Sequence, residues 1–386
     1  MNSPQSSETN NFLHQWLMLS IALLLLSSFI AYNIFQEYRR IENSERVRLS
    51  AQTEIVEKNI TPQLLLTYRL IDGIIHDLPS WRAENDGFKH ANHLLKLIDD
   101  ATVGISPIII IQADGKVIAS SEETLVGMNF AYREYFKTAR KNPDPKILHI
   151  SVPFKTVLNT YVISLFRTIT GPHGEFAGIV IVSAVPEYFS ILLDSVCYSP
   201  DMWAAIAHGD GKLFQISTAK TSLANSDLFK PEILFARHMK SGKTSNIYKG
   251  TVYATGENSM IALRTIQPAN PPTDKPLVVA MARDIKALFS SWHKNAFIQS
   301  LLFGVIAISS SLGLFIVQRR QRDQFSERKK SLDELEYVKD CFQQALNGSQ
   351  HILYRLDVKK GCYDYRAGLR QKLPLDGLKF QVSWND

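Results

Sequence analysis

Two long uncharged apolar runs stand near the two ends of the chain, one at 13–35 and the other at 296–317. A helix of roughly 20 apolar residues crosses the hydrocarbon core of a bilayer. The pattern therefore predicts two transmembrane helices, with residues 36–295 as a domain outside one face of a membrane. The first run predicts a retained anchor, because no basic residue precedes it and no small-residue cleavage site follows it.

The basic residues beside these runs predict the orientation. Lysine and arginine are enriched on the cytoplasmic side of a span, and six of them follow the second run within 319–330. Arg39, Arg40, Arg46 and Arg48 follow the first run and argue the other way, but long loops translocate largely regardless of charge. We therefore expect the ends of the chain, 1–12 and 318–386, in the cytoplasm. The protein then spans the inner (plasma) membrane twice, with the lipid bilayer as a partner.

Two further stretches show helical spacing of apolar residues. The first predicts a long helix after the first span, with Leu64, Tyr68, Ile71, Ile75 and Leu78 on one face. We expect Pro62 to kink this helix or to start a new segment. The spacing leaves open whether the face packs on its own domain or forms the seam of a dimer. The second, 332–346, predicts a cytoplasmic signalling helix, 318–346, that pairs as a coiled coil, so we expect a homodimer.

The region between the spans shows period-two patterns that occur twice. A hairpin predicted at 108–119 turns at Asp114-Gly115, and a second at 204–216 turns at Asp210-Gly211, 96 positions later. Both aspartates are interpreted as turn residues rather than metal ligands. A strand followed by a helix also recurs, at 178–193 and 276–289. Two patterns that each recur at nearly the same spacing indicate a duplicated module.

Each copy predicts five antiparallel strands, with helices on one face. After the hairpins, the strands are expected at 147–152, 161–168 and 176–184 in the first copy, and at 245–254, 259–266 and 277–282 in the second. The fold class is therefore α+β, with a long N-terminal helix and two antiparallel-sheet modules between the two spans. Asp201 and Trp203 open the second module and are interpreted as packing between the modules.

Composition narrows the chemistry. The net charge of +6 and the isoelectric point near 9.0 reflect basic segments next to the membrane, which contact anionic lipid, so no nucleic-acid partner is predicted. Of three cysteines, only Cys197 lies between the spans, which excludes an intradomain disulfide and paired-cysteine metal sites there. We expect no cofactor, no metal and no catalytic residue.

The order of these parts resembles a double Cache (tandem PAS-like) extracytoplasmic sensor. The segment Gly127–Phe136, with an arginine followed by aromatic residues, resembles the ligand-loop motif of the distal Cache module. The resemblance implies a long helical region at 36–105, a distal module at 106–200 and a proximal module at 201–295. It also implies a small-molecule ligand in the distal module.

Other segments resemble the sensor regions that precede PAS and GGDEF modules in diguanylate cyclases: 142–145, 152–154, 198–203 and 250–256. Residues 342–357 resemble the opening helix and first strand of a PAS domain, so 347–386 is expected to be a partial cytoplasmic PAS domain. The chain contains no output signature of its own and is not predicted to be an enzyme. The resemblance implies a sensor that relays to a diguanylate cyclase and cyclic di-GMP signalling. The alternatives are the input half of a sensor histidine kinase and a chemoreceptor-like sensor.

Arg133 is the strongest ligand-binding candidate, because a guanidinium binds a carboxylate through two parallel hydrogen bonds. Tyr135 and Phe136 are expected to form flat pocket walls, and Tyr132 to close the pocket. The alternative is structural: Arg133 caps or salt-bridges its helix, and both aromatic residues belong to the core. Arg167 and His149, on inner strands, are further candidates.

Ser183 stands where amino-acid-sensing members of the family place a carboxylate for the ammonium group of the ligand. Tyr135 also replaces a tryptophan common in that branch. The resemblance therefore implies a carboxylate or another small polar metabolite rather than an α-amino acid.

The predicted topology is tested with reporter fusions. A fusion at Ser199 is expected to behave as extracytoplasmic and a fusion at Asp386 as cytoplasmic, because the basic residues of 319–330 hold the second span in that orientation. Alkaline phosphatase and a fluorescent protein are suitable paired reporters. The reverse pattern would contradict the sensor model.

Overall fold

The computed structural model describes residues 4–157, 161–184, 186–217, 233–252, 256–348, 353–357 and 362–366. It contains two compact units. The sheet-bearing unit is Ile30–Ile298, and the helical unit combines Met1–Phe29 with Gln299–Asp386. Helices α1 (Pro4–Ala83) and α7 (Ser290–Gly348) each contribute to both units.

The helical unit contains most of each of the two apolar runs. Both α1 and α7 include stretches long and apolar enough to cross a membrane, as the sequence predicts. Trp16 Nε1 donates to Gln318 Oε1 at 2.9 Å, so the start of the first run contacts the end of the second. Strands β12 (Leu353–Asp357) and β13 (Cys362–Arg366) pair antiparallel. The remainder of the expected PAS segment lies outside the described residues.

Helix α1 continues through Pro62 without a break, so the expectation of a new segment there is wrong. Its face at Leu64, Ile71 and Leu78 is 3%, 0% and 2% exposed and belongs to the main hydrophobic core. These positions therefore pack on the same chain. Of the two alternatives that the spacing left open, the seam of a dimer does not apply to this face.

The distal module carries a six-stranded sheet, β2-β1-β6-β5-β3, with β4 paired to β5. Its strands are β1 (Ile105–Gln112), β2 (Val117–Ser120), β3 (His149–Ile150), β4 (Phe154–Lys155), β5 (Tyr161–Thr170) and β6 (Phe176–Ala184). Its helices are α2 (Gly87–Ala101), the 3-10 turn η1 (Glu123–Leu125) and α3 (Glu134–Lys141). The strand expected at 147–152 is shorter, because Leu148 pairs with Thr273 of the proximal module and Pro153, which has no N–H to donate, follows.

The proximal module carries a five-stranded sheet in the equivalent order, β8-β7-β11-β10-β9. Its strands are β7 (Met202–His208), β8 (Leu213–Ile216), β9 (Ser245–Thr251), β10 (Asn258–Ile266) and β11 (Leu277–Asp284). Helix α4 (Pro186–Val196) precedes the sheet, α5 (Leu234–Ser241) lies between β8 and β9, and α6 (Ile285–Leu288) leads into α7. The two modules thus share one topology.

The duplication extends to individual hydrogen bonds. Ser121 N donates to Ile108 O, and 96 positions later Ser217 N donates to Ala204 O, at 2.9 and 2.8 Å. In each pair the serine Oγ accepts from the strand amide in return. Both hairpin glycines, Gly115 and Gly211, have a positive φ, and Asp114 Oδ1 accepts from Lys116 N, as expected of a turn aspartate.

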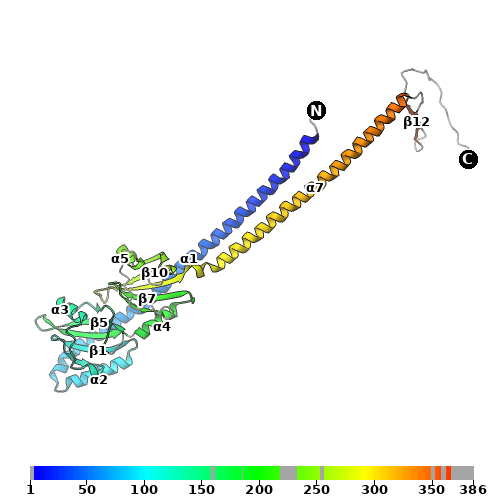
Figure 1. Cartoon of the computed structure of the whole chain (residues 1–386). Helices are drawn as coiled ribbons and strands as arrows, with labels where there is room; N and C mark the ends of the chain where they lie inside the picture. The colour runs from blue at the N-terminus through cyan, green and yellow to red at the C-terminus, as the bar shows by residue number, and fades with distance from the viewer. Residues whose placement is uncertain are drawn as a thin grey trace. The chain divides into compact units, whose positions relative to one another are not determined.

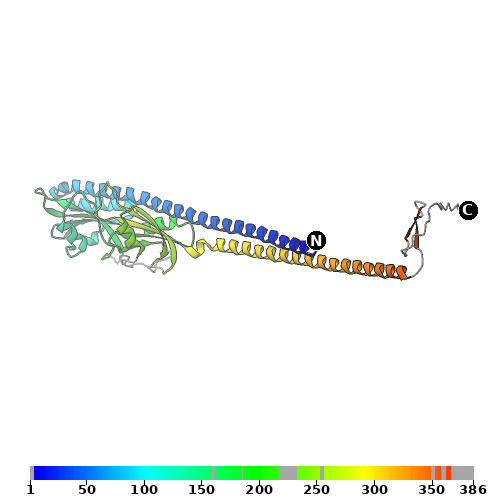
Figure 2. The ribbon, with the colours of Figure 1, turned by 90° about the horizontal axis from the view of Figure 1, so that it is seen from above.

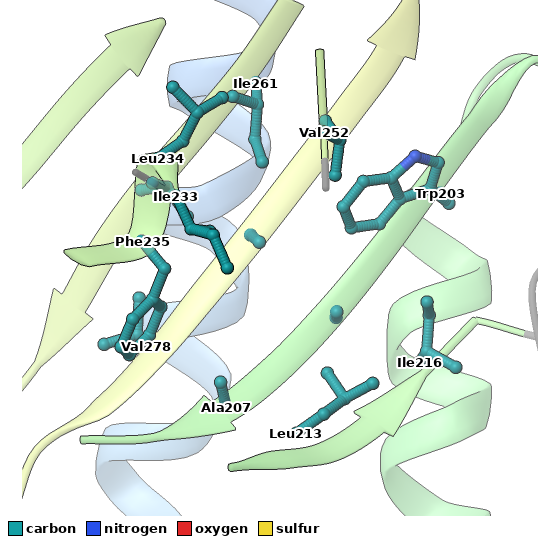
Figure 3. A pocket seen from close by; sticks show the side chains of 13 residues that line it. Trp203, Ala207, Leu213, Ile216, Ile233, Leu234, Phe235, Val252, Ile261 and Val278 are labelled. Carbon is teal, nitrogen blue, oxygen red and sulfur yellow. The ribbon is translucent and has the colours of Figure 1, made fainter. Parts of the chain in front are cut away.

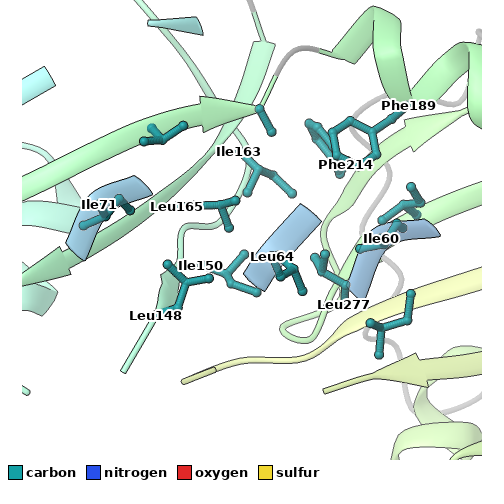
Figure 4. Close-up of a cluster of buried hydrophobic side chains, with 14 of the residues drawn as sticks. Ile60, Leu64, Ile71, Leu148, Ile150, Ile163, Leu165, Phe189, Phe214 and Leu277 are labelled. Carbon is teal, nitrogen blue, oxygen red and sulfur yellow. The ribbon is translucent and has the colours of Figure 1, made fainter. Parts of the chain in front are cut away.

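Both sheets are covered on two faces, not one. On one side α1 lies along both sheets (Figures 1 and 2), and the residues that meet there form a continuous core. Figure 4 shows this core where the modules meet: Ile60, Leu64 and Ile71 of α1, Leu148, Ile150, Ile163 and Leu165 of the distal module, and Phe189, Phe214 and Leu277. On the other side α3 and α5 cover smaller cores of their own. The expectation of helices on a single face is therefore wrong, because these two short helices pack on the opposite face.

Ion pairs reinforce the attachment of α1. Arg167 on β5 donates to Asp72 at 2.7 Å, and Arg264 on β10 donates to Glu57 at 2.8 Å. Arg283 on β11 donates to Glu45 at 2.9 Å. Each arginine extends from a strand to a carboxylate of α1, so charge as well as apolar packing fixes the helix against the sheets.

Arg283 is at the centre of the most buried of these networks. Its Nε donates to Asp201 Oδ2 at 2.9 Å, and Tyr198 also donates to Glu45, whose side chain is only 4% exposed. Burial opposes ionisation of Asp201, but the hydroxyl of Ser199 and the guanidinium outweigh it and hold the pKa of Asp201 below its usual value.

We expect Arg283→Met to destabilise the protein by roughly 3 kcal/mol, because it leaves Glu45 buried without its cation. Thermal unfolding of the purified chain measures the change. Arg46→Met is the control and should cost less than about 1 kcal/mol, since Arg46 is more exposed and pairs with Glu42 one turn away. A double variant with Glu45→Gln should recover part of the loss. Equal effects of Arg283→Met and Arg46→Met would contradict the network.

The apolar positions of α7 beyond its long apolar run are exposed in the single chain. Leu332, Leu335, Val338 and Phe342 are 67%, 69%, 59% and 52% exposed. An apolar row of this spacing is typical of a coiled-coil seam. We therefore expect Leu335→Cys to form a disulfide-linked dimer in membranes under oxidising conditions, in a background without Cys341 and Cys362. Non-reducing electrophoresis detects it, and exclusively monomeric protein would contradict the pairing.

Candidate functional site

The loop that presents Arg133 is held by the first hairpin of the distal module. Phe130 N donates to Gly115 O at 2.8 Å. A Cβ at position 115 would lie 2.5 Å from the Cβ of Ala131, so only glycine permits this approach. Arg133 follows at the N-cap position of α3, with extended backbone (φ −69°, ψ 139°). The hairpin therefore fixes the backbone position from which the Arg133 side chain extends.

The Arg133 guanidinium has aromatic neighbours and, among the described residues, no carboxylate partner. Its Cζ lies 5.2 Å from the centroid of the Tyr132 ring and 5.3 Å from that of Phe154. Its Nη1 donates to Lys155 O at 3.2 Å. Its side chain makes no capping hydrogen bond, and within the described part of the chain no acidic group lies within ion-pair distance. The structural alternative of a capping or salt-bridging arginine therefore does not describe its contacts.

Two hollows meet at Arg133. The inner cavity has a volume of about 40 Å³ and is lined by distal residues that include Ile109, Ile181 and Ser183. The junction groove has a volume of about 610 Å³ and lies between the modules, with His208, Asp210, Asp274 and Lys275 on its proximal wall. Arg133, Tyr135 and Phe154 line both. The Arg133 side chain therefore borders two hollows of very different size.

The inner cavity is neutral apart from Arg133. Ser164 and Ser183 share a hydrogen bond between their hydroxyls at 3.0 Å, and both are buried. Burial raises the pKa of Tyr135, so its phenol stays neutral. No carboxylate is found among the described residues that line this cavity. The cavity therefore offers a cation to a ligand but no counter-ion for an ammonium group.

The structure brings four of the predicted site residues together and not the other three. Arg133, Tyr132, Tyr135 and Ser183 line one or both hollows. Phe136 is 1% exposed and packs edge-on to Phe176 in the core under α3. Phe136 is therefore a core residue, which is the structural alternative to a pocket wall.

Arg167 and His149 lie elsewhere. Arg167 donates to Pro145 O and Asp72, and its guanidinium lies 4.0 Å from the centroid of the Tyr68 ring, so it attaches β5 to α1. His149 Nδ1 lies 2.9 Å from Asp274 Oδ2, and its ring stacks on Phe166. His149 therefore belongs to the contact between the modules.

No local sequence pattern identifies the proximal wall of the groove. Asp274 and Lys275 lie in a loop whose position depends on how the modules pack, and Asp210 has the sequence context of a turn residue. Phe154 lies in a segment, 152–154, that resembles other sensor regions but contains no pattern typical of a ligand site. Among the residues that the structure describes, no cluster of His, Cys, Asp and Glu is placed to hold a metal ion.

The proximal module has a hollow of another kind. It measures about 50 Å³, and every described side chain that lines it is apolar or aromatic (Figure 3). Trp203 forms part of its wall, beside Val252 and Ile216. The expectation that Trp203 packs between the modules is therefore wrong, because alternation along β7 turns its ring toward the α5 side of its own sheet.

No family model and no curated protein matches the chain. Solved structures do. The periplasmic sensory domain of the Campylobacter jejuni chemoreceptor Tlp1 is 11% identical with a TM-score of 0.50, and the match covers 64% of this chain and 98% of that one. The ligand-binding domain of the Pseudomonas fluorescens chemoreceptor CtaA, in complex with L-isoleucine, is 15% identical with a TM-score of 0.49, covering 67% and 99%.

The extracellular domain of a candidate histidine kinase, rpHK1S-Z16, is 22% identical with a TM-score of 0.49, covering 63% of this chain and 98% of that one. At these identities the likeness concerns the fold alone. The chain is therefore similar in fold to the periplasmic sensory domain of Tlp1, with a long N-terminal helix and two antiparallel-sheet modules.

Proposed function

We propose that the chain is a transmembrane sensor that binds a small carboxylate at Arg133 of its distal module, outside the cytoplasm. One observation carries the proposal. A guanidinium without an acidic partner among the described residues stands where the inner cavity and the junction groove meet. Buried or half-buried charges are normally paired, and Arg167, Arg264 and Arg283 all have acidic partners. Arg133 has the position and chemistry of a group that is completed by a ligand.

The surroundings of Arg133 favour a carboxylate over an amino acid. The planar fork binds two carboxylate oxygens at once, and the rings of Tyr132 and Phe154 hold the guanidinium in place through cation–π contact. The hydroxyls of Ser164 and Ser183 provide weak polar contacts but no negative charge for an ammonium group. A small carboxylate without an amino group, or another small polar metabolite, fits this arrangement.

The same proposal includes the membrane and the dimer. Residues 13–35 and 296–317 cross the inner membrane, with 36–295 outside and both ends in the cytoplasm. The contact between Trp16 and Gln318 supports it, because it places the start of the first run beside the end of the second. Two chains pair along the exposed apolar row of α7. Ligand binding then needs only different affinities for two arrangements of the helices to produce a signal.

The proposed output is a diguanylate cyclase, so the signal is cyclic di-GMP. This part rests on the sequence segments that resemble cyclase sensor regions and on the PAS-like segment 347–386. A histidine kinase and a chemoreceptor are the rival outputs. Reading the gene past the codon for Asp386 separates them, because a Gly-Gly-Asp-Glu-Phe signature supports the cyclase and a phosphoacceptor-histidine helix contradicts it.

We expect Arg133→Ala to abolish the stabilisation of the chain by small carboxylates while leaving the unliganded protein folded. Losing a charge-assisted hydrogen bond costs roughly 1.5–3 kcal/mol, or tenfold or more in affinity. Arg133→Lys should also bind weakly, since an ammonium cannot reproduce the fork. Thermal-shift measurements on the purified chain with a panel from acetate to benzoate test both variants.

Arg140→Ala is the matched control, because Arg140 lies on the same helix, is exposed and lines neither hollow. It should bind as the wild type does. Unfolding of Arg133→Ala without ligand, or wild-type binding by it, would show that Arg133 is structural and would end the proposal.

A further inference from the structure

The two hollows at Arg133 differ in what they can contain. A cavity needs roughly 10–15 Å³ of accessible volume to hold even one water, so the inner cavity, at about 40 Å³, has room for a few waters but not for a metabolite. The junction groove, at about 610 Å³, lies within the range of roughly 300–1,000 Å³ that is typical of small-molecule sites. A metabolite held by Arg133 must therefore extend into the groove.

The groove is lined on its distal side by rings. Phe166 is 1% exposed and Tyr135 is 9% exposed, while Tyr132 stands at the rim with 57% exposure. Phe154 lies close to Tyr135, with ring centroids 5.2 Å apart. Offset and edge-on contacts between rings favour a flat aromatic guest over a flexible chain of the same volume. The shape of the ligand is therefore constrained as well as its charge.

The opposite wall belongs to the proximal module and is held there by buried contacts. Asp274 Oδ1 accepts from Ile150 N at 2.9 Å, and Asp274 Oδ2 lies 2.9 Å from His149 Nδ1. His208 Nε2 lies 3.1 Å from Ile150 O. Beyond these contacts, Lys275 pairs with Asp210 at 2.8 Å, and both side chains are nearly half exposed. The far wall is thus rigid at its base and polar at its rim.

The charges in the groove leave one attachment point for an anion. Both oxygens of Asp274 are used by the distal module, Lys275 is paired with Asp210, and Glu134 is paired with Lys137 at 2.7 Å. Arg133 has no acidic partner within the described residues. One carboxylate therefore binds at Arg133. The rest of the ligand contacts the aromatic rings of the distal wall and a rim whose charged side chains are paired with one another.

We propose that the junction groove is the ligand site for a flat aromatic carboxylate of one or two rings, with its carboxylate on Arg133 and its ring system between the distal and proximal modules. This inference rests on the proposed function and adds the ligand class and the position of its body. Because the groove has a wall from each module, such a ligand stabilises the arrangement in which the two walls face each other.

Titration calorimetry of the purified full chain with 2-naphthoate and with acetate tests the inference. Lys275→Trp places an indole in the groove at a surface position whose ion pair is solvent-exposed. It is expected to weaken 2-naphthoate binding at least tenfold and acetate binding far less, because acetate is small enough to bind at Arg133 without filling the groove. Lys240→Trp is the matched control, since Lys240 is an exposed residue of the same module that does not line the groove. It should bind both probes normally.

A second variant removes a ring without filling space. Tyr132→Leu should weaken acetate binding by no more than about fivefold, through the lost cation–π contact with Arg133. It should weaken 2-naphthoate binding by about a further two- to tenfold, the usual range for one lost ring contact. Tyr132 is exposed enough that the change should not alter folding.

The inference fails if Lys275→Trp and Tyr132→Leu bind 2-naphthoate as the wild type does, or if the wild type binds it no more tightly than acetate. If acetate binding still requires Arg133 in either case, the proposed function remains. If Arg133→Ala binds both probes like the wild type, or the wild type binds neither, the proposed function and the inference fail together.

Discussion

The packing of both sheets on one helix is the constraint on which the other features of the sheet-bearing unit depend. Residues of α1 from Leu49 to Trp81 belong to the same core as the inward-facing residues of both modules. Helix α1 therefore covers part of the inward face of each sheet, so a movement of either module relative to the helix must break apolar contacts. Small displacements in such a core lead to discrete alternative packings rather than continuous deformation.

The arginines of the two modules differ in whether they contact α1. Arg167, Arg264 and Arg283 extend from three different strands to carboxylates on α1, where partial burial makes each pair costly to break. Arg133 differs because the hairpin below it holds it away from α1, beside aromatic rings. The contrast explains why Arg167, though equally basic and also on the distal module, has a structural role. Arg133 adjoins Tyr135, which packs on the face of the distal sheet that α1 does not cover.

The repeated strand order was readable from the sequence because it depends on local patterns. The alternation of apolar residues and the Asp-Gly turns at 114–115 and 210–211 are local signals, and the hydrogen bonds of the two hairpins match residue for residue. Pro62 does not start a new segment, because tertiary packing of α1 outweighs the loss of one helical hydrogen bond.

The candidate site was only partly predictable. Arg133, Tyr132 and Tyr135 stand within one short segment, so a motif could identify them. Asp274 and Lys275 are separated from that segment by more than one hundred residues, and only the packing of one module on the other brings them to the groove. The strand position of His149 predicts a ligand-binding side chain, but its Nδ1 contacts Asp274 instead.

Asp274 of the proximal module contacts the edge of the distal sheet, and this contact limits how the two modules can be exchanged between related proteins. Leu148 pairs with Thr273, and Asp274 contacts His149 and Ile150, so the edge of the distal sheet is completed by a loop of the other module. The modules are duplicates in topology but are not interchangeable parts. A chimera that imports a new distal module must also import residues 270–275, because otherwise the edge strand and its histidine lose their partners. Recombination between related proteins is thus expected to preserve strand β3 and this loop as one inherited set.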